Sequence, residues 1–342
     1  MFLINRAIKD LNNIFLWIFN LNFTCLALFV NVKKDRKGSM DLFLVYILRL
    51  GLKVMQRRIM KDVVGAHISI GKGFAQAVVN AEAINATAMQ IFTKSNRQWY
   101  AKKIGEKERE NFKIQLKKSQ IRTVVVHASY LINLASTCPD MREKSIKGLI
   151  VEIERCALLD IPYLVLHPGS ALKGCREQAL KFVAEGVNQA FEETKDAKVV
   201  VSLETMAGSG SEVGSSFEEI TAIINKVKNK DRIGVTIDTC HIFSAGYDLR
   251  TTKACEQTFD LFEKVVGMKY LKVIHFNDSK KMLNAHIDRH ESLGKGMIGI
   301  DCFRYIVRNK SLISIPKILE TPDPDQYESE IAQMRSWISE DV

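Results

Sequence analysis

Three of the seven histidines in this chain fall within one short segment. The segment reads HFNDSKKMLNAHIDRHESLGKG and contains His275, His286 and His290. Imidazole serves proteins mainly as a general acid or base and as a metal ligand. The segment therefore indicates acid-base or metal chemistry, and the first question is which of these histidines take part in it.

Further histidines and carboxylates stand at the ends of short runs of β-branched residues, each of which is expected to be a strand. Polar residues close seven of these runs: His67, His127, His167, Glu204, Asp238, His275 and Glu320. A single histidine or glutamate in such a place is usually a hydrogen-bonded structural residue. Seven such residues crowded together would be costly without a cation, so the pattern predicts a metal site.

The ligand types narrow the choice of metal and the number of sites. Histidine, aspartate and glutamate without cysteine suit zinc, manganese or iron in a catalytic site. Six of the seven residues, all except His67, fit two metals about 3.5 to 4 Å apart that share a carboxylate. His241, Asp288 and His290 would make a third site, because Asp-x-His in an extended loop places both side chains on one face.

The strands that must position these residues recur through most of the chain. Eight runs fit this pattern, at residues 62–66, 88–92, 123–127, 163–167, 198–204, 233–238, 271–275 and 316–320. Amphipathic stretches at 106–119, 141–160 and 215–229 lie between them and predict helices. Strict alternation predicts an α/β fold, a (β/α)8 TIM barrel with its active site at the carboxyl-terminal rim of the strands. An open doubly wound sheet is the alternative, but GAHISIGKGF lacks its glycine-rich phosphate motif.

Residues 1–59 form a different kind of sequence. The apolar run 14–30 is flanked by basic residues and is slightly shorter than the roughly 20 residues that span a membrane. No convincing signal-peptide cleavage site follows it. A membrane or targeting segment, a structured appendage, and upstream sequence joined to a protein that begins at Met60 are the three alternatives. We favour the third, with residues 1–59 as an extension outside the fold and 60–342 as the barrel domain.

Charge and cysteine content set broader bounds. Residues 1–59 carry +7 of the formal net charge of +10, which leaves +3 for residues 60–342, so charge alone does not establish DNA binding. The seven cysteines are scattered without a C-x-x-C pair, as expected for reduced thiols in the cytoplasm. Alternation along the chain should turn Cys240 away from its neighbours Asp238 and His241 and into the core.

Several longer motifs resemble a known family. In chain order they are HASYLINL, LHPGS, LETMAGSG, IDTCHIFSAGYDLRT, HFNDSK, DRHESLGKGMIG and ILET. Together they closely resemble endonuclease IV, the zinc-dependent apurinic/apyrimidinic (AP) endonuclease family of base excision repair. The similarity extends from about Met60 to near the C-terminus.

The resemblance implies three Zn²⁺ ions per chain, with Mn²⁺ able to replace zinc at one or more sites. By resemblance, His127 and His167 hold one zinc, and Glu204 bridges it to a second. The remaining ligands of the second zinc are Asp238, His275 and Glu320, and those of the third are His241, Asp288 and His290. Glu204 would also orient the attacking water, whereas His286 is a loop residue that the family does not require.

The resemblance also implies the reaction and the partner. The expected activity is hydrolysis of the phosphodiester 5′ to abasic sites in duplex DNA, which leaves 3′-hydroxyl and 5′-deoxyribose phosphate ends, together with a 3′-end repair diesterase activity. Arg97, in the cationic and aromatic segment TKSNRQWYAKK, would intercalate, and Tyr130 would lie near the abasic gap. A cytoplasmic monomer bound to DNA, with no obligate protein partner, is expected.

Two alternatives to this function remain. A sugar isomerase built on the same barrel would use two metals at the strand ends, without the third site of His241, Asp288 and His290. A membrane-tethered binding module without activity would rest only on residues 14–48 and would not need the full ligand set.

Overall fold

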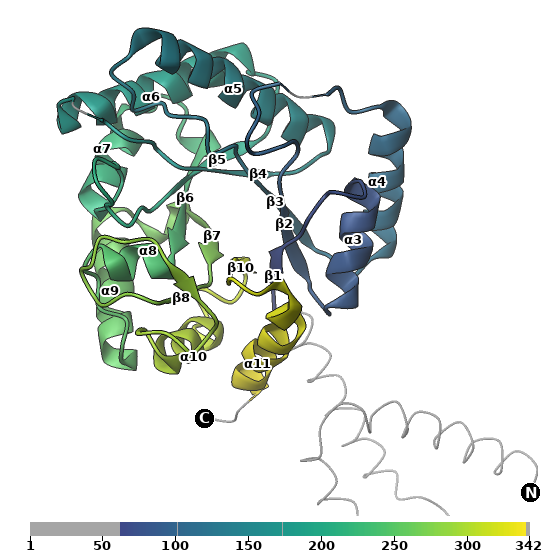
Figure 1. Cartoon of the computed structure of the whole chain (residues 1–342), viewed down its shortest axis with the longest axis vertical. Coiled ribbons are helices and arrows are strands. Elements are labelled where there is room, and N and C mark those ends of the chain that lie inside the picture. The colour runs from purple at the N-terminus through teal and green to yellow at the C-terminus, as the bar shows by residue number, and fades with distance from the viewer. Residues whose placement is uncertain (1–61, 101, 173, 340–342) are drawn as a thin grey trace, which may run out of the picture. The chain divides into compact units, whose positions relative to one another are not determined.

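The computed structural model describes residues 62–100, 102–172 and 174–339, and within them it forms a closed barrel of parallel strands surrounded by helices (Figure 1). The (β/α)8 expectation is therefore confirmed. The extension 1–59 lies outside the described residues, so our interpretation of it stays a prediction. No helix in the described part is long and apolar enough to cross a bilayer.

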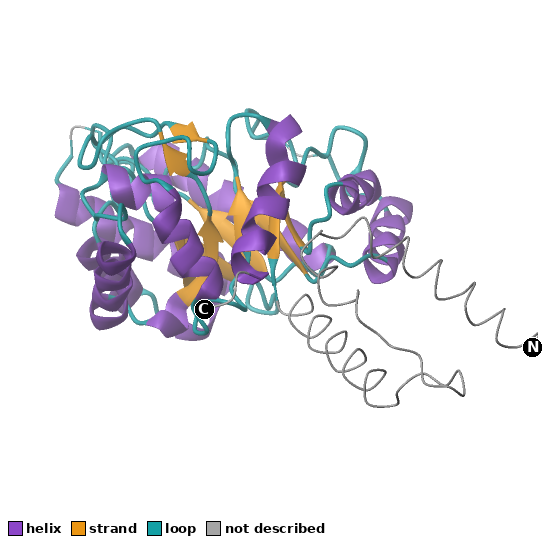
Figure 2. Ribbon diagram, turned by 90° about the horizontal axis from the view of Figure 1, so that it is seen from below, coloured by secondary structure: helices purple, strands orange, loops and turns teal. Residues whose placement is uncertain are grey.

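The barrel strands follow one another around the closed sheet in chain order, and β10 lies between β7 and β1. Their bounds are β1 Val64–His67, β2 Ala88–Ile91, β3 Thr123–His127, β4 Tyr163–Leu166, β5 Val200–Glu204, β6 Ile233–Asp238, β7 Leu271–His275 and β10 Lys317–Leu319. Figure 2 shows these strands enclosed by the helices. Because every barrel pair is parallel, all carboxyl ends meet at one rim.

The surrounding helices are α3 Phe74–Ala83, α4 Glu106–Lys118, α5 Pro139–Leu158, α6 Arg176–Glu193, α7 Phe217–Lys226, α9 Thr252–Val265, α10 Ile300–Arg308 and α11 Tyr327–Ser339. Local signals explain several of their starts. Helix α5 has a proline in its first turn, where the missing N–H costs nothing. Helix α7 begins after Ser216, whose side chain accepts a hydrogen bond from the Glu219 N–H.

The two-residue period of a strand decides which side chains enter the barrel. Val125, Val165 and Val273 belong to a small apolar cluster of their own, separate from the larger core. Their chain neighbours pack in that larger core, which also contains the buried faces of the helices. Two residues beyond each of these valines comes a histidine, so the same period points His127, His167 and His275 inward at the rim.

Two short elements add side chains above this rim. Helix α8 (Thr239–Ser244) follows β6 directly, and Asp238 caps it by accepting a hydrogen bond of 2.9 Å from the His241 N–H. Strands β8 (Asp278–Ser279) and β9 (His290–Glu291) form an antiparallel pair in which Ser279 is opposite His290. The cap and the strand pair hold His241 and His290 in fixed backbone positions.

A buried lysine lies at the opposite end of the barrel. Lys317 begins β10 and is 2% exposed, and its ammonium group donates to the Leu312 carbonyl. Burial lowers the pKa of Lys317 to about 7, an effect that the nearby charge of Asp62 partly offsets. In the folded protein this amine therefore loses its proton near neutral pH, whereas in the unfolded chain it stays charged.

We predict that Lys317→Met stabilises the protein more at pH 6 than at pH 9. Below pH 7 both the folded and the unfolded chain carry the proton, so the full cost of the buried charge is present. As the pH rises from 7 toward the unfolded pKa of about 10.4, the folded chain loses this proton while the unfolded chain keeps it. The stability of the wild type therefore increases over this range. Between pH 6 and pH 9 the benefit of the substitution should fall by about 3 kcal/mol.

Denaturant unfolding of wild type and variant at the two pH values measures the difference. Lys310→Met, at an exposed position in the same region of the chain, is the control and should show no such pH dependence. An equal effect of Lys317→Met on the free energy of unfolding at pH 6 and pH 9 would contradict the lowered pKa of Lys317.

Candidate metal centre

The first of three side-chain clusters joins strands β3, β4 and β5. His127 and Glu204 are almost fully buried, and His167 is partly exposed. The Oε2 atom of Glu204 lies 3.3 Å from His127 Nε2 and 3.1 Å from His167 Nε2. One potential ligand atom from each residue falls within 4.8 Å of the others, a spacing at which a single ion could contact all three.

The second cluster uses the other oxygen of the same glutamate. Glu204 Oε1 lies 2.9 Å from His275 Nδ1, which is also 3.3 Å from Glu320 Oε2 and 3.8 Å from Asp238 Oδ2. The four residues again place potential ligand atoms within 4.8 Å of one another. Glu204 thus belongs to both clusters, with one carboxylate oxygen directed to each.

The third cluster brings together residues that are distant in sequence. Asp288 Oδ2 lies 3.3 Å from His241 Nε2, and Asp288 Oδ1 lies 3.3 Å from His290 Nε2. His290 Nε2 is also 3.5 Å from Asp238 Oδ2, so the third cluster adjoins the second. The sequence analysis expected these three residues to meet, and the structure brings them together.

Electrostatics within the clusters favour ionised carboxylates. Burial by itself would raise the pKa of Glu204, but the charges of His275 and His167 hold it well below its ordinary value. The pKa of Asp288 is lowered to about 2, because His241 and His290 outweigh its burial. In the same way, Glu320 and Glu204 overcome the burial of His275 and raise its pKa to about 9. The carboxylates therefore stay ionised, and cations that take the place of the imidazole protons would balance their charge.

Several buried atoms of the clusters have no hydrogen-bond partner. Among the described residues these include Glu204 Oε2, His241 Nε2 and His290 Nε2. Buried polar atoms are nearly always paired, and unpaired ones are costly. A cation would satisfy all three, so the donor set fits metal ions, and its mixture of imidazoles and carboxylates suits zinc or manganese.

The orientation of most cluster histidines is set by backbone carbonyls. The Nδ1 atoms of His127, His241 and His290 lie 2.7, 2.8 and 3.0 Å from the carbonyl oxygens of Ala128, Thr205 and Glu320. When Nδ1–H donates to a carbonyl, the Nε2 lone pair is free for a cation. All three rings present Nε2 to the clusters, as this rule requires.

Cys240 corrects one of the sequence predictions. It is buried, as expected for a core residue, but its sulfur lies within 4.8 Å of potential ligand atoms of Asp238 and His290, so it does not point away from the site. The strand alternation ends at Asp238 because helix α8 begins at the next residue. Burial raises the pKa of the Cys240 thiol to about 12, which keeps it protonated and neutral.

His286 lies outside all three clusters. It is exposed, its backbone has a left-handed φ of 52°, and its Nδ1 contacts the Ala207 carbonyl at 3.2 Å. The segment 275–296 thus divides as expected, because His275 and His290 enter separate clusters and His286 enters none.

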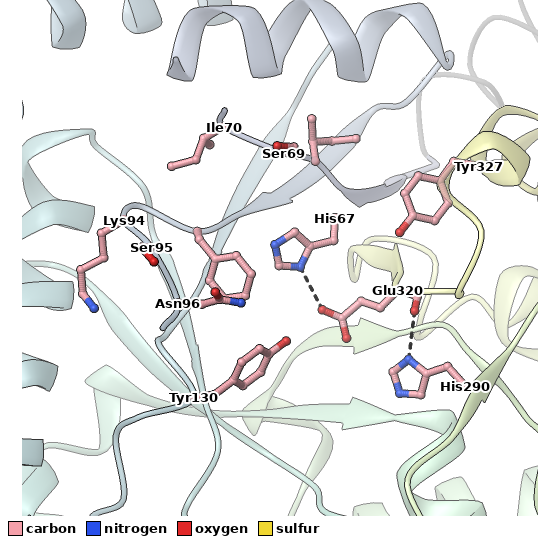
Figure 3. A pocket seen from close by; sticks show the side chains of 12 residues that line it. His67, Ser69, Ile70, Lys94, Ser95, Asn96, Tyr130, His290, Glu320 and Tyr327 are labelled. Carbon is pink, nitrogen blue, oxygen red and sulfur yellow. Dashed lines mark hydrogen bonds and ion pairs between the residues drawn. The ribbon is translucent and has the colours of Figure 1, made fainter. Parts of the chain in front are cut away.

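A cavity of about 540 Å³ opens beside the clusters, and Tyr130, His67, His290 and Glu320 contribute to its wall (Figure 3). The ring of Tyr130 lies 5.1 Å from that of His127 and 5.5 Å from that of His167. Burial and nearby carboxylates raise the pKa of Tyr130, so its hydroxyl stays protonated. It can therefore donate a hydrogen bond to a group bound in the cavity.

Arg97 lies in the loop after β2 and is exposed. Two contacts of Lys94 fix the same loop. Its ammonium group lies 3.3 Å from buried Glu152 and donates to the Gln98 carbonyl at 3.0 Å. Trp99 is partly buried against the core, under the Lys144 ammonium. Of the residues that suggested DNA contact in this loop, Arg97 is thus exposed, Lys94 is held by its ion pair at the cavity wall, and Trp99 packs against the core.

Two buried polar residues of the site were missed by the sequence analysis. Asn277 donates to Asp238 Oδ2 at 2.8 Å and accepts from the Glu320 N–H at 2.8 Å. Gln90 hydrogen-bonds to both His275 and Glu320. The available signal was weak, namely a glutamine inside the apolar run AMQIF and an asparagine directly after HF.

An eight-stranded parallel barrel with clustered histidines and carboxylates at its carboxyl-terminal rim defines a TIM-barrel enzyme with a metal-binding type of site. A family model described as xylose isomerase-like TIM barrel matches residues 78–340. Within that class the sequence is more specific. The chain is 44% identical over 276 residues to "Probable endonuclease 4" of Buchnera aphidicola subsp. Acyrthosiphon pisum (strain Tuc7), covering 80% of this chain and 98% of that protein.

Solved structures agree. Endonuclease IV from Thermus thermophilus is 34% identical with a TM-score of 0.73, covering 81% of this chain and 99% of its own. A D-tagatose 3-epimerase-like protein, 17% identical with a TM-score of 0.63 over 80% of this chain and 97% of its own, shares the fold alone. The chain belongs to the endonuclease IV family, and it is a hydrolase of the AP endonuclease class.

We predict that bound metal contributes strongly to stability. Saturating Zn²⁺ at about 1,000 times its Kd would stabilise the folded state by about 4 kcal/mol, which for a domain of this size is about 7 °C in melting temperature. Thermal melts of chelator-treated and zinc-reloaded protein measure the difference. His275→Ala should reduce it, while the exposed control His286→Ala should leave it unchanged. Identical melts with and without zinc would contradict a metal centre.

Proposed function

We propose that the protein hydrolyses the phosphodiester 5′ to abasic sites in duplex DNA, leaving 3′-hydroxyl and 5′-deoxyribose phosphate ends. The observation that carries this proposal is the position of Glu204, whose two oxygens face two different ligand clusters. Membership of the endonuclease IV family supports the DNA repair role. We further propose that the enzyme acts as a cytoplasmic monomer and also removes blocking groups from 3′ ends.

We assign one zinc ion to each cluster, with manganese able to replace zinc at one or more sites. The first two ions would share Glu204 as a ligand. Asp288, His241 and His290 would hold the third. When bound, such ions lower the pKa of water toward neutrality and neutralise phosphate charge. A phosphodiester repels an anionic nucleophile, so charge neutralisation at the rim is a chemical requirement for its hydrolysis.

The chain's own residues would orient the reactants. Glu204 is buried and ionised, so it can accept a hydrogen bond from the attacking water and hold it in line with phosphorus. Tyr130 stays protonated at the cavity wall and can donate to the sugar-phosphate backbone of the abasic nucleotide. The cavity has room for a sugar that lacks its base, and such a sugar costs less to flip out of the stack than an intact nucleotide.

A sugar isomerase reaction is the alternative for the same barrel. Its two metal sites would need only the first two clusters, and the third cluster of His241, Asp288 and His290 would have no role. The complete third cluster therefore favours phosphodiester hydrolysis, in which an additional cation can offset charge on the phosphate and the leaving oxygen.

Cleavage of an abasic duplex by wild type and by Glu204→Gln tests the assignment. A duplex with one tetrahydrofuran abasic analogue should be cut by metal-replete wild type and spared when a strong chelator is present. Glu204→Gln should reduce the cleavage rate to below about one-thousandth of that of wild type. A neutral amide lacks the charge to bind two cations or to orient the attacking water. The control Glu193→Gln, on the exposed side of α6, should retain activity.

The ends of the product complete this test. Extension of the cleaved strand by a DNA polymerase would demonstrate a 3′-hydroxyl. An intact strand in the presence of zinc, or full activity of Glu204→Gln, would refute the proposal.

A second prediction concerns DNA recognition. Arg97→Ala should weaken binding to the abasic duplex by about tenfold or more, because it removes an exposed guanidinium next in the chain to Asn96, which lines the cavity. Its metal content should remain that of wild type, since Arg97 belongs to none of the clusters. Fluorescence anisotropy with uncleavable DNA, combined with metal analysis, gives both values. Arg109→Ala, on helix α4, is the matched control, and zinc loading of Arg97→Ala well below wild type would disprove this assignment.

A further inference from the structure

Gln90 is a buried amide that connects both members of a ligand pair. It lies in β2 and is fully buried. Its Oε1 lies 2.8 Å from His275 Nε2, and its Nε2 lies 2.6 Å from Glu320 Oε1. The amide nitrogen is also 3.0 Å from His67 Nδ1. One uncharged side chain thus contacts three polar residues of the rim.

The carboxylate of Glu320 determines which way this amide faces. An ionised carboxylate only accepts hydrogen bonds, so the side of the amide next to it must be the NH₂ group. The reverse orientation would place two acceptor oxygens 2.6 Å apart. The amide oxygen must therefore face His275.

The orientation of the amide in turn determines the tautomer of His275. An amide oxygen only accepts, so His275 Nε2 must carry the hydrogen that it donates. When a cation displaces the second ring proton, the other nitrogen has the free lone pair. That nitrogen, Nδ1, is the one that lies 2.9 Å from Glu204 Oε1 and 3.3 Å from Glu320 Oε2.

His275 differs in this respect from its neighbours. The rings of His127, His241 and His290 are turned the other way, with Nδ1 on a backbone carbonyl and Nε2 toward the clusters. Their orientation is fixed by the main chain. The orientation of His275 depends on a side chain, which a single substitution can remove.

We propose that Gln90 is a positioning residue that makes His275 bind the cation of the second cluster through Nδ1 and fixes the Glu320 carboxylate beside it. The inference rests on the proposed metal centre, but it concerns metal binding and not the cleavage of DNA. Groups that orient metal ligands in this way typically change metal affinity by 10- to 100-fold when they are removed.

Zinc retention by the full-length protein tests the proposal. Gln90→Met has nearly the same length but can neither accept from His275 nor donate to Glu320. In competition with a chromophoric chelator, one of its zinc ions should be held about 10- to 100-fold less tightly than the corresponding ion of wild type. Met89→Leu is the matched control, because this buried neighbour on β2 packs in the core shared with the helices and should bind zinc normally. Equal zinc affinities of Gln90→Met and wild type would overturn the proposal.

The coordinating nitrogen of His275 gives a second measurement, made on wild type, which does not require Gln90→Met to fold. In wild type loaded with zinc and labelled with ¹⁵N-histidine, long-range ¹H–¹⁵N spectra should show one ring bound through Nδ1 and protonated at Nε2. The signal is assigned by its absence from His275→Ala. Coordination of His275 through Nε2 would refute the role of Gln90. A wild type that binds zinc but leaves abasic DNA intact would instead contradict the proposed function alone.

Discussion

The interaction on which the site depends is the contact between one buried carboxylate and four imidazole rings. Glu204 has no measurable exposure, and its oxygens lie within 3.3 Å of ring nitrogens of His127, His167, His241 and His275. Such a concentration of ionisable groups is costly away from water unless the charges are balanced. Cations among these groups would supply that balance, so a metal centre accounts for both the composition and the burial of the rim.

The barrel makes this arrangement possible through its geometry. Parallel strands end at a common rim, and their two-residue period points every second side chain inward. Asp238 extends the arrangement beyond the strands, since it caps helix α8 at the His241 N–H and lies 3.5 Å from His290. One residue thereby couples the second cluster to the third.

The fold by itself does not determine the reaction. Epimerase-like proteins with low sequence identity share this barrel, so the function must be argued from the site. The third cluster is the feature that favours phosphodiester hydrolysis over the reaction of a two-metal sugar enzyme. Its residues lie beyond the barrel strands, in helix α8, in strand β9 and in the loop before β9, on the rim where TIM barrels vary most without loss of the fold.

The sequence by itself determined the alternation of strands and helices, the strand-end ligand types and the expected grouping of His241, Asp288 and His290. Local periodicity and residue chemistry are sufficient for those conclusions. Only the tertiary structure revealed that Cys240 lies beside the site and that Gln90 hydrogen-bonds to His275. The first depends on a helix that begins directly after Asp238, and the second on hydrogen bonds between strands that are far apart in the chain. Neither relation has a local signal, because ring orientation and close approach depend on how the strands close into a barrel.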